Sequence, residues 1–294
     1  MRPHVLCAVG GHGDELFVLR SRSRRGHSVP AAVRASAGGC ALNVAAGLAA
    51  LGAGVTHAGL RGDDAAGSMV AAALRRHGVA DAALIVPGAA TGRYAAMVEP
   101  DGTLALAAAA MDVYAAMPRL AAHAPFREAL KGADALVLDA NGPPGAAEEL
   151  AALRDGAALA LLATSPRKAR TLAGLMTRAT IVFANEQEWA GLGNVAERVP
   201  LAFVTMGARG ARALVHGREA ANAAPPPGAL LDVVGGGDAF AAGALLAHLT
   251  GASPAGALER GLDCAARCVA REGALGWLAA PERATRAAER EPTA

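Results

Sequence analysis

The sequence predicts an α/β fold with a mostly parallel central sheet and a smaller second sheet. The main observation is that short apolar segments alternate with helical segments, an order typical of a parallel sheet flanked by helices. We expect buried strands at residues 4–9, 55–60, 135–139, 158–163, 180–184, 201–205 and 212–216. Polar residues follow several of these segments, and strand ends are where open α/β sheets bind ligands.

A second, smaller sheet is predicted from two segments outside this alternation. Two alternating runs within 85–111 flank Glu99-Pro100-Asp101-Gly102, a turn sequence typical of a hairpin. Alternating arginines in 16–34 suit the solvated face of a strand or hairpin; they are Arg20, Arg22, Arg24 and Arg25. An RNA-binding arm is the alternative there, and the lack of interleaved aromatic residues disfavours it. We expect a small β-sheet lid with its strands within 14–36 and 85–112.

Composition indicates a single domain spanning residues 1–294. Of the 294 residues, 53% are hydrophobic and 18% are charged, which is ample for a sizeable core. Residues 281–294 alternate Arg and Glu with Ala, which indicates a surface tail.

Charge and hydropathy exclude several classes of partner. The 28 basic and 26 acidic residues leave a net charge of +2, which argues against a general nucleic-acid binder. The N-terminus lacks the apolar run of a signal peptide, and the most apolar helix, residues 239–249, is too short to cross a bilayer. The four cysteines contain no CxxC pair. We therefore expect a cytoplasmic protein without membrane or nucleic-acid partners.

The stretch 231–249 carries the strongest chemical pattern. Gly235, Gly236 and Gly237 precede Asp238 and a helix of small residues. Glycines leave backbone N–H groups accessible and a helix N-terminus attracts anions, so this junction suits a phosphate group. Asp238 would be placed there to accept a proton from an attacking hydroxyl. The alternative is that Asp238 only caps the helix, and this stretch alone does not separate the two.

Other polar residues complete a pattern suited to phosphoryl transfer. Asp14 follows the first strand, in a glycine-rich turn that fails the GxGxxG spacing because Leu16 occupies the last position. Asn43 lies in the first turn of a second glycine-to-helix junction at 36–52. Polar groups also end three later strands: Asp139 and Asn141, Asn185 and Glu188, Thr205 and Gly207. Phosphoryl transfer needs a base, N–H donors and oxygen ligands for Mg²⁺, and the sequence contains no P-loop.

Three motifs give the chain a resemblance to the ribokinase-like, or phosphofructokinase B type (PfkB), carbohydrate and nucleoside kinases over nearly its whole length. Gly38-Gly39 with Asn43 is similar to the N-terminal glycine motif of the family. Residues 232–238 are similar to its D-T-x-G-A-G-D motif, with Val233 in place of Thr and Gly236 in place of Ala. Asn185-Glu186-Gln187-Glu188 matches its N-x-x-E motif. The resemblance implies a three-layer α/β/α core with a small β-sheet lid.

The resemblance also implies roles for individual residues. Asp238 would be the catalytic base, and Gly235, Gly236 and Gly237 the anion hole for the transferred phosphoryl group. The nucleotide, ATP, would bind at Asn185, Thr205, Gly207, Gly210 and Asp232, with Asn185 and Glu188 organising Mg²⁺ largely through water. The acceptor ribose would be held by Asp14, Gly38, Gly39 and Asn43. A monovalent cation such as K⁺ and a homodimer formed through the lid are further expectations.

Within the family, the middle of the chain looks most similar to the pseudouridine kinases. The run LIVPG at 84–88, then Thr91, Tyr94 and Met111-Asp112, follows their lid pattern, and Asp139, Asn141, Ser165 and Lys168 continue it. The resemblance implies that the acceptor base is bound by Thr91, Met111, Asp112, Asp139 and Asn141. Two residues depart from the pattern: Ala110 stands where an acidic residue is expected, and Leu42 where Arg is common.

The function expected from this resemblance is ATP-dependent phosphorylation of the 5′-hydroxyl of pseudouridine. A kinase for another ribofuranoside or sugar is the main alternative: adenosine, a further nucleoside, ribose or a fructose-type sugar. A non-catalytic nucleoside-binding protein of the same fold is a second alternative, which retention of Asp238 and Glu188 disfavours. A nucleotide-cofactor oxidoreductase is disfavoured by the failed GxGxxG spacing.

Overall fold

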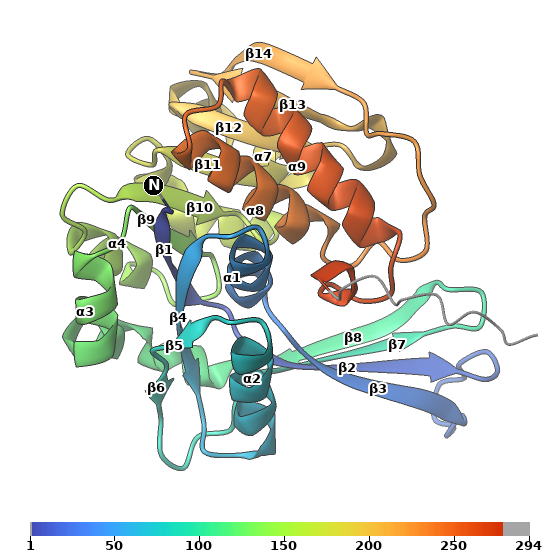
Figure 1. The fold of residues 1–294 in the computed structure, drawn as a ribbon. Coiled ribbons are helices and arrows are strands. Elements are labelled where there is room, and N and C mark those ends of the chain that lie inside the picture. The colour runs from blue at the N-terminus through green and yellow to red at the C-terminus, as the bar shows by residue number, and fades with distance from the viewer. Residues whose placement is uncertain (1, 279–294) are drawn as a thin grey trace, which may run out of the picture.

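The protein is built on two sheets, as Figure 1 shows in a computed structural model that describes residues 2–278. The central sheet has the strand order β14-β13-β12-β11-β10-β9-β1-β4-β5, with β6 also paired to β4. Its strands are β1 (His4–Val9), β4 (Gly54–Arg61), β5 (Ala80–Asp81), β6 (Leu84–Ile85), β9 (Ala135–Asp139), β10 (Ala158–Leu162), β11 (Ile181–Asn185), β12 (Leu201–Thr205), β13 (Ala211–Val215) and β14 (Arg218–Ala223). Every predicted strand is present, with ends that differ by one residue at most.

The central sheet is parallel except at one edge. Neighbouring strands from β5 to β12 run parallel, whereas β12, β13 and β14 pair antiparallel. Strands of a parallel sheet are normally covered on both faces, which explains their nearly continuous apolar sequences. The predicted mostly parallel sheet is therefore confirmed.

Helices cover both faces of this sheet and make three layers. One face packs against α1 (Cys40–Ala50), α2 (Ala65–Arg76), α8 (Gly236–Leu249) and α9 (Pro254–Val269). The other packs against α3 (Ala124–Lys131), α4 (Ala146–Ala152), α5 (Pro166–Ala169), α6 (Ala173–Met176) and α7 (Glu186–Ala190). Short 3₁₀ segments are η1 (Asp112–Ala122), η2 (Arg170–Leu172), η3 (Gly193–Arg198), η4 (Gly207–Arg209) and η5 (Gly276–Leu278).

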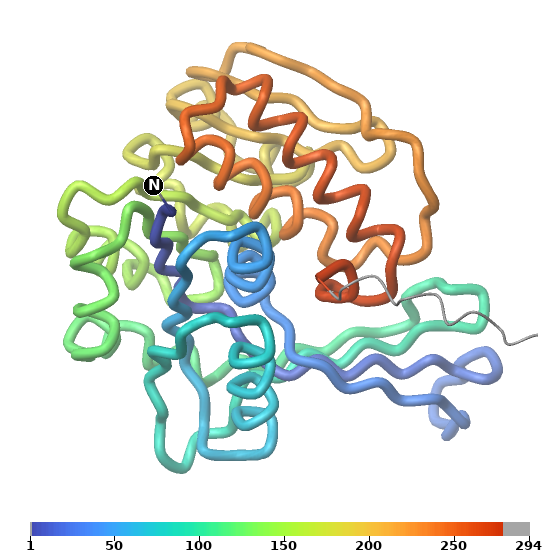
Figure 2. Tube along the Cα trace, viewed as in Figure 1, coloured from blue at the N-terminus to red at the C-terminus, as the bar shows by residue number. Residues whose placement is uncertain are grey.

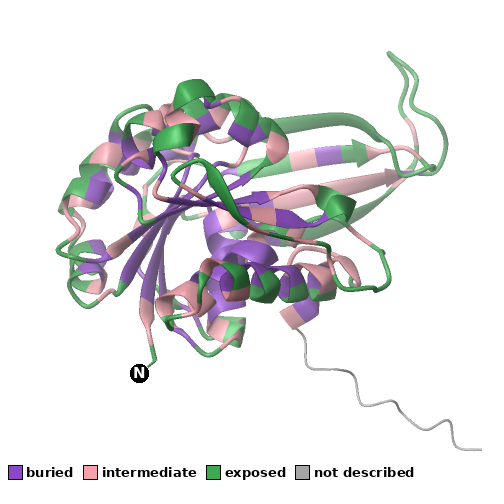
Figure 3. Cartoon of the chain, turned by 90° about the horizontal axis from the view of Figure 1, so that it is seen from above, coloured by how far each residue is buried: buried purple, intermediate pink, exposed green. Residues whose placement is uncertain are grey.

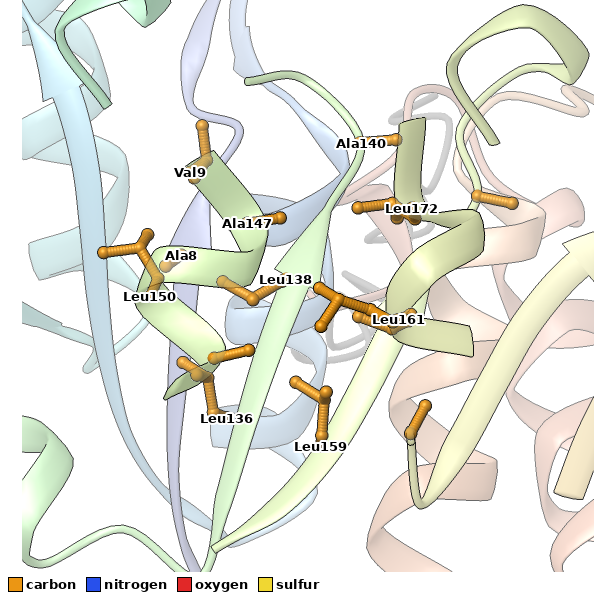
Figure 4. Close-up of a cluster of buried hydrophobic side chains, with 14 of the residues drawn as sticks. Ala8, Val9, Leu136, Leu138, Ala140, Ala147, Leu150, Leu159, Leu161 and Leu172 are labelled. Atoms are coloured by element: carbon orange, nitrogen blue, oxygen red, sulfur yellow. The ribbon is translucent and has the colours of Figure 1, made fainter. Parts of the chain in front are cut away.

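Alternate residues of each buried strand belong to opposite faces of the sheet. In β1, Val5 and Cys7 pack with α1 and α8, whereas Leu6 and Ala8 pack with the helices of the other layer. This follows from the period of two along a strand. Figure 4 shows part of the buried hydrophobic cluster on the side of the sheet that α3 to α7 cover, where leucines of β9 and β10 lie beside side chains of α4.

Three of the few aromatic residues hold α8 against the sheet. Phe183 of β11 stacks on Phe203 of β12 with ring centroids 5.7 Å apart. Phe240 of α8 meets both rings edge-on, at 6.4 and 5.8 Å. Such edge-to-face contacts add to the burial of apolar area. They hold α8, two residues after Asp238, against the middle residues of β11 and β12.

The predicted small sheet is confirmed, and it extends from one side of the body (Figure 1). Its order is β3-β2-β7-β8, formed by β2 (His12–Leu19), β3 (Ala31–Gly38), β7 (Arg93–Val98) and β8 (Leu104–Ala110). Strands β7 and β8 are joined at the predicted turn, where Gly102 has φ +86° and its N–H donates to the carbonyl of Glu99. Figure 3 shows that exposed residues predominate in this sheet, while the central strands are buried.

The arginines predicted on the solvated face of a strand or hairpin lie in a hairpin loop. Strand β2 ends at Leu19, so Arg20, Arg22, Arg24 and Arg25 belong to the connection between β2 and β3. Arg22 donates a hydrogen bond to Asp101 in the β7–β8 turn, at 2.8 Å. These arginines are therefore exposed in the loop of the hairpin formed by β2 and β3, as the hairpin alternative predicts, and they do not lie on a strand.

The chain path after β14 brings residues 224–235 to the start of α8 (Figure 2). The N–H groups of Leu231 and Asp232 both donate to the carbonyl of Val269, at the end of α9. The predicted tail, 281–294, lies outside the described residues. Among residues 2–278, none of the helices combines the length and the apolar character needed to span a bilayer.

Candidate active site

The site lies where the carboxyl ends of parallel strands meet the first turns of α1 and α8. Both helices start at a glycine with positive φ, Gly39 at +110° and Gly235 at +78°. A side chain at Gly39 would lie 2.8 Å from the backbone of Gly10, and one at Gly235 would lie 2.5 Å from Ala274. Both positions therefore require glycine on conformational and steric grounds.

A cavity of about 290 Å³ brings many of the predicted residues together. Its lining includes Asn185, Glu188, Thr205, Gly235, Gly237 and Asp238, together with Cys40 of α1. These residues come from β11, α7, β12 and the start of α8. The candidate base, the candidate metal-organising residues and part of the predicted nucleotide turn thus share one cavity.

Asp238 is the third residue of α8 and does not cap the helix. Gly235 is the N-cap, and no side chain provides a capping hydrogen bond there. The helix-cap alternative is therefore wrong. Instead, the Asn43 amide nitrogen donates to Oδ2 of Asp238 at 2.8 Å. Burial raises the pKa of Asp238 to about 6, although the hydrogen bonds from Asn43 and Cys40 oppose this shift.

The three glycines before Asp238 differ in their surroundings. Gly236 donates its N–H to the carbonyl of Val233 at 3.3 Å. Nothing lies within 4 Å of the position that a side chain at Gly237 would take. The backbone of the first turn of α8 is thus open to the cavity, and first-turn N–H groups of a helix lack helical acceptors.

Asp139, at the end of β9, is fully buried and organises the backbone of the site. Its Oδ2 accepts from the N–H groups of Gly10 at 3.0 Å and Ala41 at 3.3 Å, and its Oδ1 accepts from Asn141 at 3.0 Å. Burial raises the pKa of this carboxyl, and these hydrogen bonds oppose the shift. Both carboxylate oxygens of Asp139 accept these hydrogen bonds, so the side chain holds the surrounding backbone in place. A direct contact between Asp139 and a substrate stays a prediction.

Asn185 and Glu188 form a reciprocal capping box at the start of α7. The N–H of Glu188 donates to Oδ1 of Asn185 at 2.9 Å, and the N–H of Asn185 donates to Oε2 of Glu188 at 2.8 Å. Burial raises the pKa of Glu188. The N-x-x-E motif therefore has a structural role that requires this spacing.

The donor set fits a hydrated Mg²⁺ rather than a metal held by protein ligands alone. Among the described residues, no three His, Cys, Asp or Glu side chains gather to hold a metal. Glu188 lines the cavity beside Asp238 and uses only Oε2 in the capping box. Mg²⁺ commonly binds through one or two carboxylates, water and phosphate oxygens, which matches these residues.

The residues predicted to bind the nucleotide lie in two places, a tight turn after β12 and the loop before α8. Gly207 and Gly210 have φ of +60° and +91°, and the N–H of Met206 donates to the carbonyl of Gly210 at 2.7 Å. Thr205 ends β12 and lines the cavity. Asp232 accepts from the N–H groups of Val234 and Gly273, both at 2.9 Å, so its carboxylate braces the loop before α8.

The predicted acceptor residues come from the small sheet, from α1 and from the end of β9 with the segment after it. Asp14 belongs to β2, and a side chain at Gly38 would lie 1.9 Å from its Oδ2. The Asn141 Oδ1 accepts from Lys168 Nζ at 2.6 Å, which joins two residues of the predicted pattern.

The positions of Thr91, Met111 and Asp112 give less direct support to their predicted contacts with the acceptor. The Thr91 side chain is buried, and its hydroxyl donates to Asp64 at 2.5 Å and accepts from the N–H of Gly62. These bonds fix the loop before α2. Met111 packs against Gly92, while Asp112 is exposed at the start of η1. Contacts of these three side chains with an acceptor stay predictions.

Sequence reasoning missed three residues at the site: His12, Cys40 and Tyr114. The Tyr114 hydroxyl accepts from the N–H of Gly11 at 3.0 Å and lies 3.2 Å from Nδ1 of His12. The only sequence signal was a histidine in the glycine-rich turn at a strand end. Tyr114 is separated from it by 102 residues, and no local pattern indicates that the two meet.

We predict that Asp139→Ala lowers the free energy of unfolding by about 3 kcal/mol or more, measured by urea denaturation. The substitution leaves three N–H donors in the site without their acceptor, and each buried unsatisfied group costs about 1–3 kcal/mol. The matched control is Asp134→Ala, whose exposed carboxylate accepts the N–H of His4 at 2.7 Å. Because water replaces that bond, we expect a loss of less than about 1 kcal/mol. Equal losses in the two variants would contradict the organising role of Asp139.

The comparisons with known proteins agree with this architecture. A family model described as pfkB family carbohydrate kinase matches residues 16–278. The chain is similar to a carbohydrate kinase from Agrobacterium tumefaciens, with 32% identity, 93% and 92% of the two chains covered, and a TM-score of 0.82. No curated protein matches the sequence.

Two more distant structures share the fold. They are a ribokinase from Thermotoga maritima, with 19% identity, 95% and 97% coverage and a TM-score of 0.80, and an adenosine kinase from Sinorhizobium meliloti, with 20% identity, 93% and 95% coverage and a TM-score of 0.75. The strand order, the separate small sheet and the match to the family model over residues 16–278 together lead to one conclusion. The chain belongs to the pfkB family of carbohydrate kinases and has the ribokinase-like fold.

Proposed function

We propose that this protein is an ATP-dependent kinase that phosphorylates the 5′-hydroxyl of a nucleoside, with pseudouridine as the expected acceptor. The observation that carries the proposal is the position of Asp238. Its carboxylate, with a pKa raised to about 6, lines one cavity with the glycine turn of α8 and Glu188. A carboxylate with a pKa close to the working pH is suited to general base catalysis.

The proposed step transfers a phosphoryl group from ATP to the acceptor. Asp238 takes the proton of the acceptor hydroxyl, whose oxygen forms a bond to the γ-phosphorus while the bond between that phosphorus and the bridging oxygen breaks. ADP leaves with that oxygen. The N–H groups of Gly235 and Gly237 stabilise the charge on the transferring group, and the N–H of Gly236 joins them by leaving its 3.3 Å hydrogen bond to the carbonyl of Val233. When bound, Mg²⁺ would neutralise phosphate charge, with Asn185 and Glu188 holding its water ligands.

The other predicted residues bind the two substrates in this proposal. Thr205, Gly207, Gly210 and Asp232 form or brace the nucleotide side. Asp14, Gly38, Gly39 and Asn43 hold the ribose, and the hydrogen bond from Asn43 to Asp238 links ribose binding to the base. Thr91, Met111, Asp112, Asp139 and Asn141 are proposed to recognise the acceptor base directly or through neighbours.

Further features of the proposal concern assembly and location. The small sheet exposes Val33, Leu104 and Leu106, each more than half exposed at 56%, 61% and 59%. These apolar side chains support a homodimer formed through the lid. A cytoplasmic location and activation by K⁺ are proposed from the family resemblance alone.

The main alternative is a kinase of the same family with another acceptor. Solved structures of this fold include ribokinases and an adenosine kinase, and one is described as a plant ribokinase complexed with ribose and ATP. Ala110 and Leu42 also depart from the pseudouridine kinase pattern. Both observations favour retaining ribose, adenosine and other sugars as candidates.

We predict that Asp238→Asn keeps the fold but lowers kcat by roughly 10²–10⁴-fold, because the amide cannot accept the proton of the hydroxyl. The measurement is ADP release with Mg-ATP and the best acceptor, together with the melting temperature. Asp263→Asn, at an exposed position of α9, is the control and should retain full kcat. An Asp238→Asn enzyme with more than about a tenth of wild-type kcat would exclude a base at this position.

The pH profile gives an independent test of the base. Asp238 acts only when ionised and its folded pKa is about 6, so acceptor kcat/KM should fall as pH decreases through that value. The fall approaches tenfold per pH unit on the acid side. The residual activity of Asp238→Asn should lack this acid limb. A wild-type profile that stays flat down to about pH 5 would show that no group with this pKa takes part.

The acceptor preference is tested with a panel of nucleosides and sugars. Pseudouridine has a free N1–H that uridine lacks, and a site that binds this group leaves a partner unpaired with uridine. We expect kcat/KM for pseudouridine to exceed that for uridine at least about tenfold. Ribose should be poorer still because it leaves the base pocket empty. If adenosine, uridine or ribose outcompetes pseudouridine, the acceptor assignment is wrong while the kinase assignment stands.

A further inference from the structure

We propose that Thr164 is a further residue of the nucleotide site, whose hydroxyl donates a hydrogen bond to a phosphate oxygen of bound ATP. The inference rests on the proposed function, in which ATP binds in the cavity that Asp238 lines. It deepens that proposal because Thr164 belongs to none of the motifs that give this sequence its family resemblance. Three observations support it: a strained backbone, a place in the cavity wall and a hydroxyl without a partner.

The backbone of Thr164 is strained. Its φ is +61°, a value that a β-branched residue rarely adopts. The N–H of Ser165 donates to the carbonyl of Ala163 at 2.8 Å. A hydrogen bond that spans a single residue with positive φ makes a γ-turn of the kind that is rare and costs free energy. Such strain is found mostly where it serves binding or catalysis, so this turn is a candidate functional feature.

A second non-glycine residue with positive φ, His216, has a local explanation that Thr164 lacks. His216 has φ +47° and is followed by Gly217 at +73°. These two residues connect β13 to β14, and two-residue hairpin turns commonly require positive φ at both positions. Thr164 instead lies between β10 and α5, where no hairpin imposes this conformation.

Thr164 lies where the proposed phosphate site is. It follows β10 directly and lines the cavity together with Asn185 and Asp238. Strand β10 pairs with β11, and the N–H of Ala163 extends this pairing by donating to the carbonyl of Phe183 at 3.0 Å. Because β11 ends at Asn185, the strained turn is next to the strand end that is proposed to organise Mg²⁺.

The hydroxyl of Thr164 is available for a ligand. Its Oγ1 is buried and has no hydrogen-bond partner among residues 2–278. A buried hydroxyl without a partner is unfavourable, so a ligand that supplies an acceptor is favoured. The hydroxyl and the methyl group both branch from Cβ, and rotation about the Cα–Cβ bond exchanges their positions without moving the backbone. Phosphate oxygens are charged acceptors, which form the stronger kind of hydrogen bond.

The first test measures nucleotide binding without turnover. The probe is β,γ-imido-ATP with Mg²⁺, and its dissociation constant is measured by calorimetry. Thr164→Val keeps the shape of the side chain but removes the hydroxyl, and should weaken binding about 5- to 50-fold. Thr164→Ser keeps the hydroxyl and should stay within about threefold of wild type.

The matched control for this test is Thr250→Val, at an exposed position at the end of α8, which should bind the probe as wild type does. Unchanged affinity in Thr164→Val overturns the inference. Equal weakening in Thr164→Val and Thr164→Ser overturns it as well, because the hydroxyl is then not the group that matters.

The second test separates phosphate binding from a general effect on the cavity. In Thr164→Val the KM for ATP should rise by about the same factor as the dissociation constant of the probe. The acceptor KM should stay unchanged, and kcat should stay within about threefold of wild type. Equal increases in the KM values for ATP and acceptor would show that Thr164 only shapes the cavity, and would overturn the inference.

The third test uses the strain itself. Glycine adopts positive φ without steric cost, so Thr164→Gly should raise the melting temperature by about 2 °C or more. The same variant lacks the hydroxyl and should bind the probe as weakly as Thr164→Val. Opposite changes in stability and affinity are expected only where strain is retained for binding. A melting temperature below that of wild type would show that the turn serves the fold, against the inference.

The outcomes distinguish this inference from the proposed function. If wild type binds the probe and Thr164→Val binds it equally well, the kinase assignment stands and the role of Thr164 is overturned. If the wild-type protein does not bind the probe, the proposed function is contradicted, and the role of Thr164 falls with it.

Discussion

The carboxylate of Asp139 is the interaction on which the rest of the site depends. It accepts N–H groups from the turn after β1, from the first turn of α1 and from the segment after β9. A side chain at Gly10 would lie only 2.0 Å from its Oδ2, so the glycine is required for this approach. One fully buried acidic group thereby holds three separate backbone segments together. Because buried donors are costly to leave unpaired, the arrangement is maintained as a unit.

The site also depends on the N-termini of two helices, α1 and α8. Gly39 begins α1, which supplies Asn43, and Gly235 begins α8, which supplies Asp238. The aromatic cluster at Phe240 seats α8, and the amide of Asn43 orients the Asp238 carboxylate. Burial is the main cause of the raised pKa of Asp238, and the negative charge of Asp139 adds to it. The same acidic group therefore shapes the site and contributes to its electrostatics.

The two sides of the site have different structural origins. The proposed nucleotide side is built from strand ends of the central sheet and from α7 and α8, whose sequence motifs are short and local. The proposed acceptor side includes residues of the small sheet and of η1, which meet through contacts such as those of His12 with Tyr114 and Asp14. Family membership follows from the match to the family model over residues 16–278, whereas the proposed choice of acceptor rests on residues in this second set of contacts. For that reason the acceptor is a proposal that requires its own test.

The sequence by itself determined the strands of the central sheet, the hairpin at residues 99–102, the two glycine-to-helix junctions and the candidate base at Asp238. These features follow from local patterns of apolar residues, glycines and turn residues. Only the tertiary structure decided that Asp238 is not a helix cap and that Asp139 accepts hydrogen bonds from distant backbone N–H groups. It also decided that Thr91 is hydrogen-bonded to Asp64 and that the Tyr114 hydroxyl contacts His12. Each of these contacts joins elements distant in the chain, and Asp139 is 129 residues from Gly10. Such pairings are selected by the packing of whole elements, which no local spacing in the sequence records.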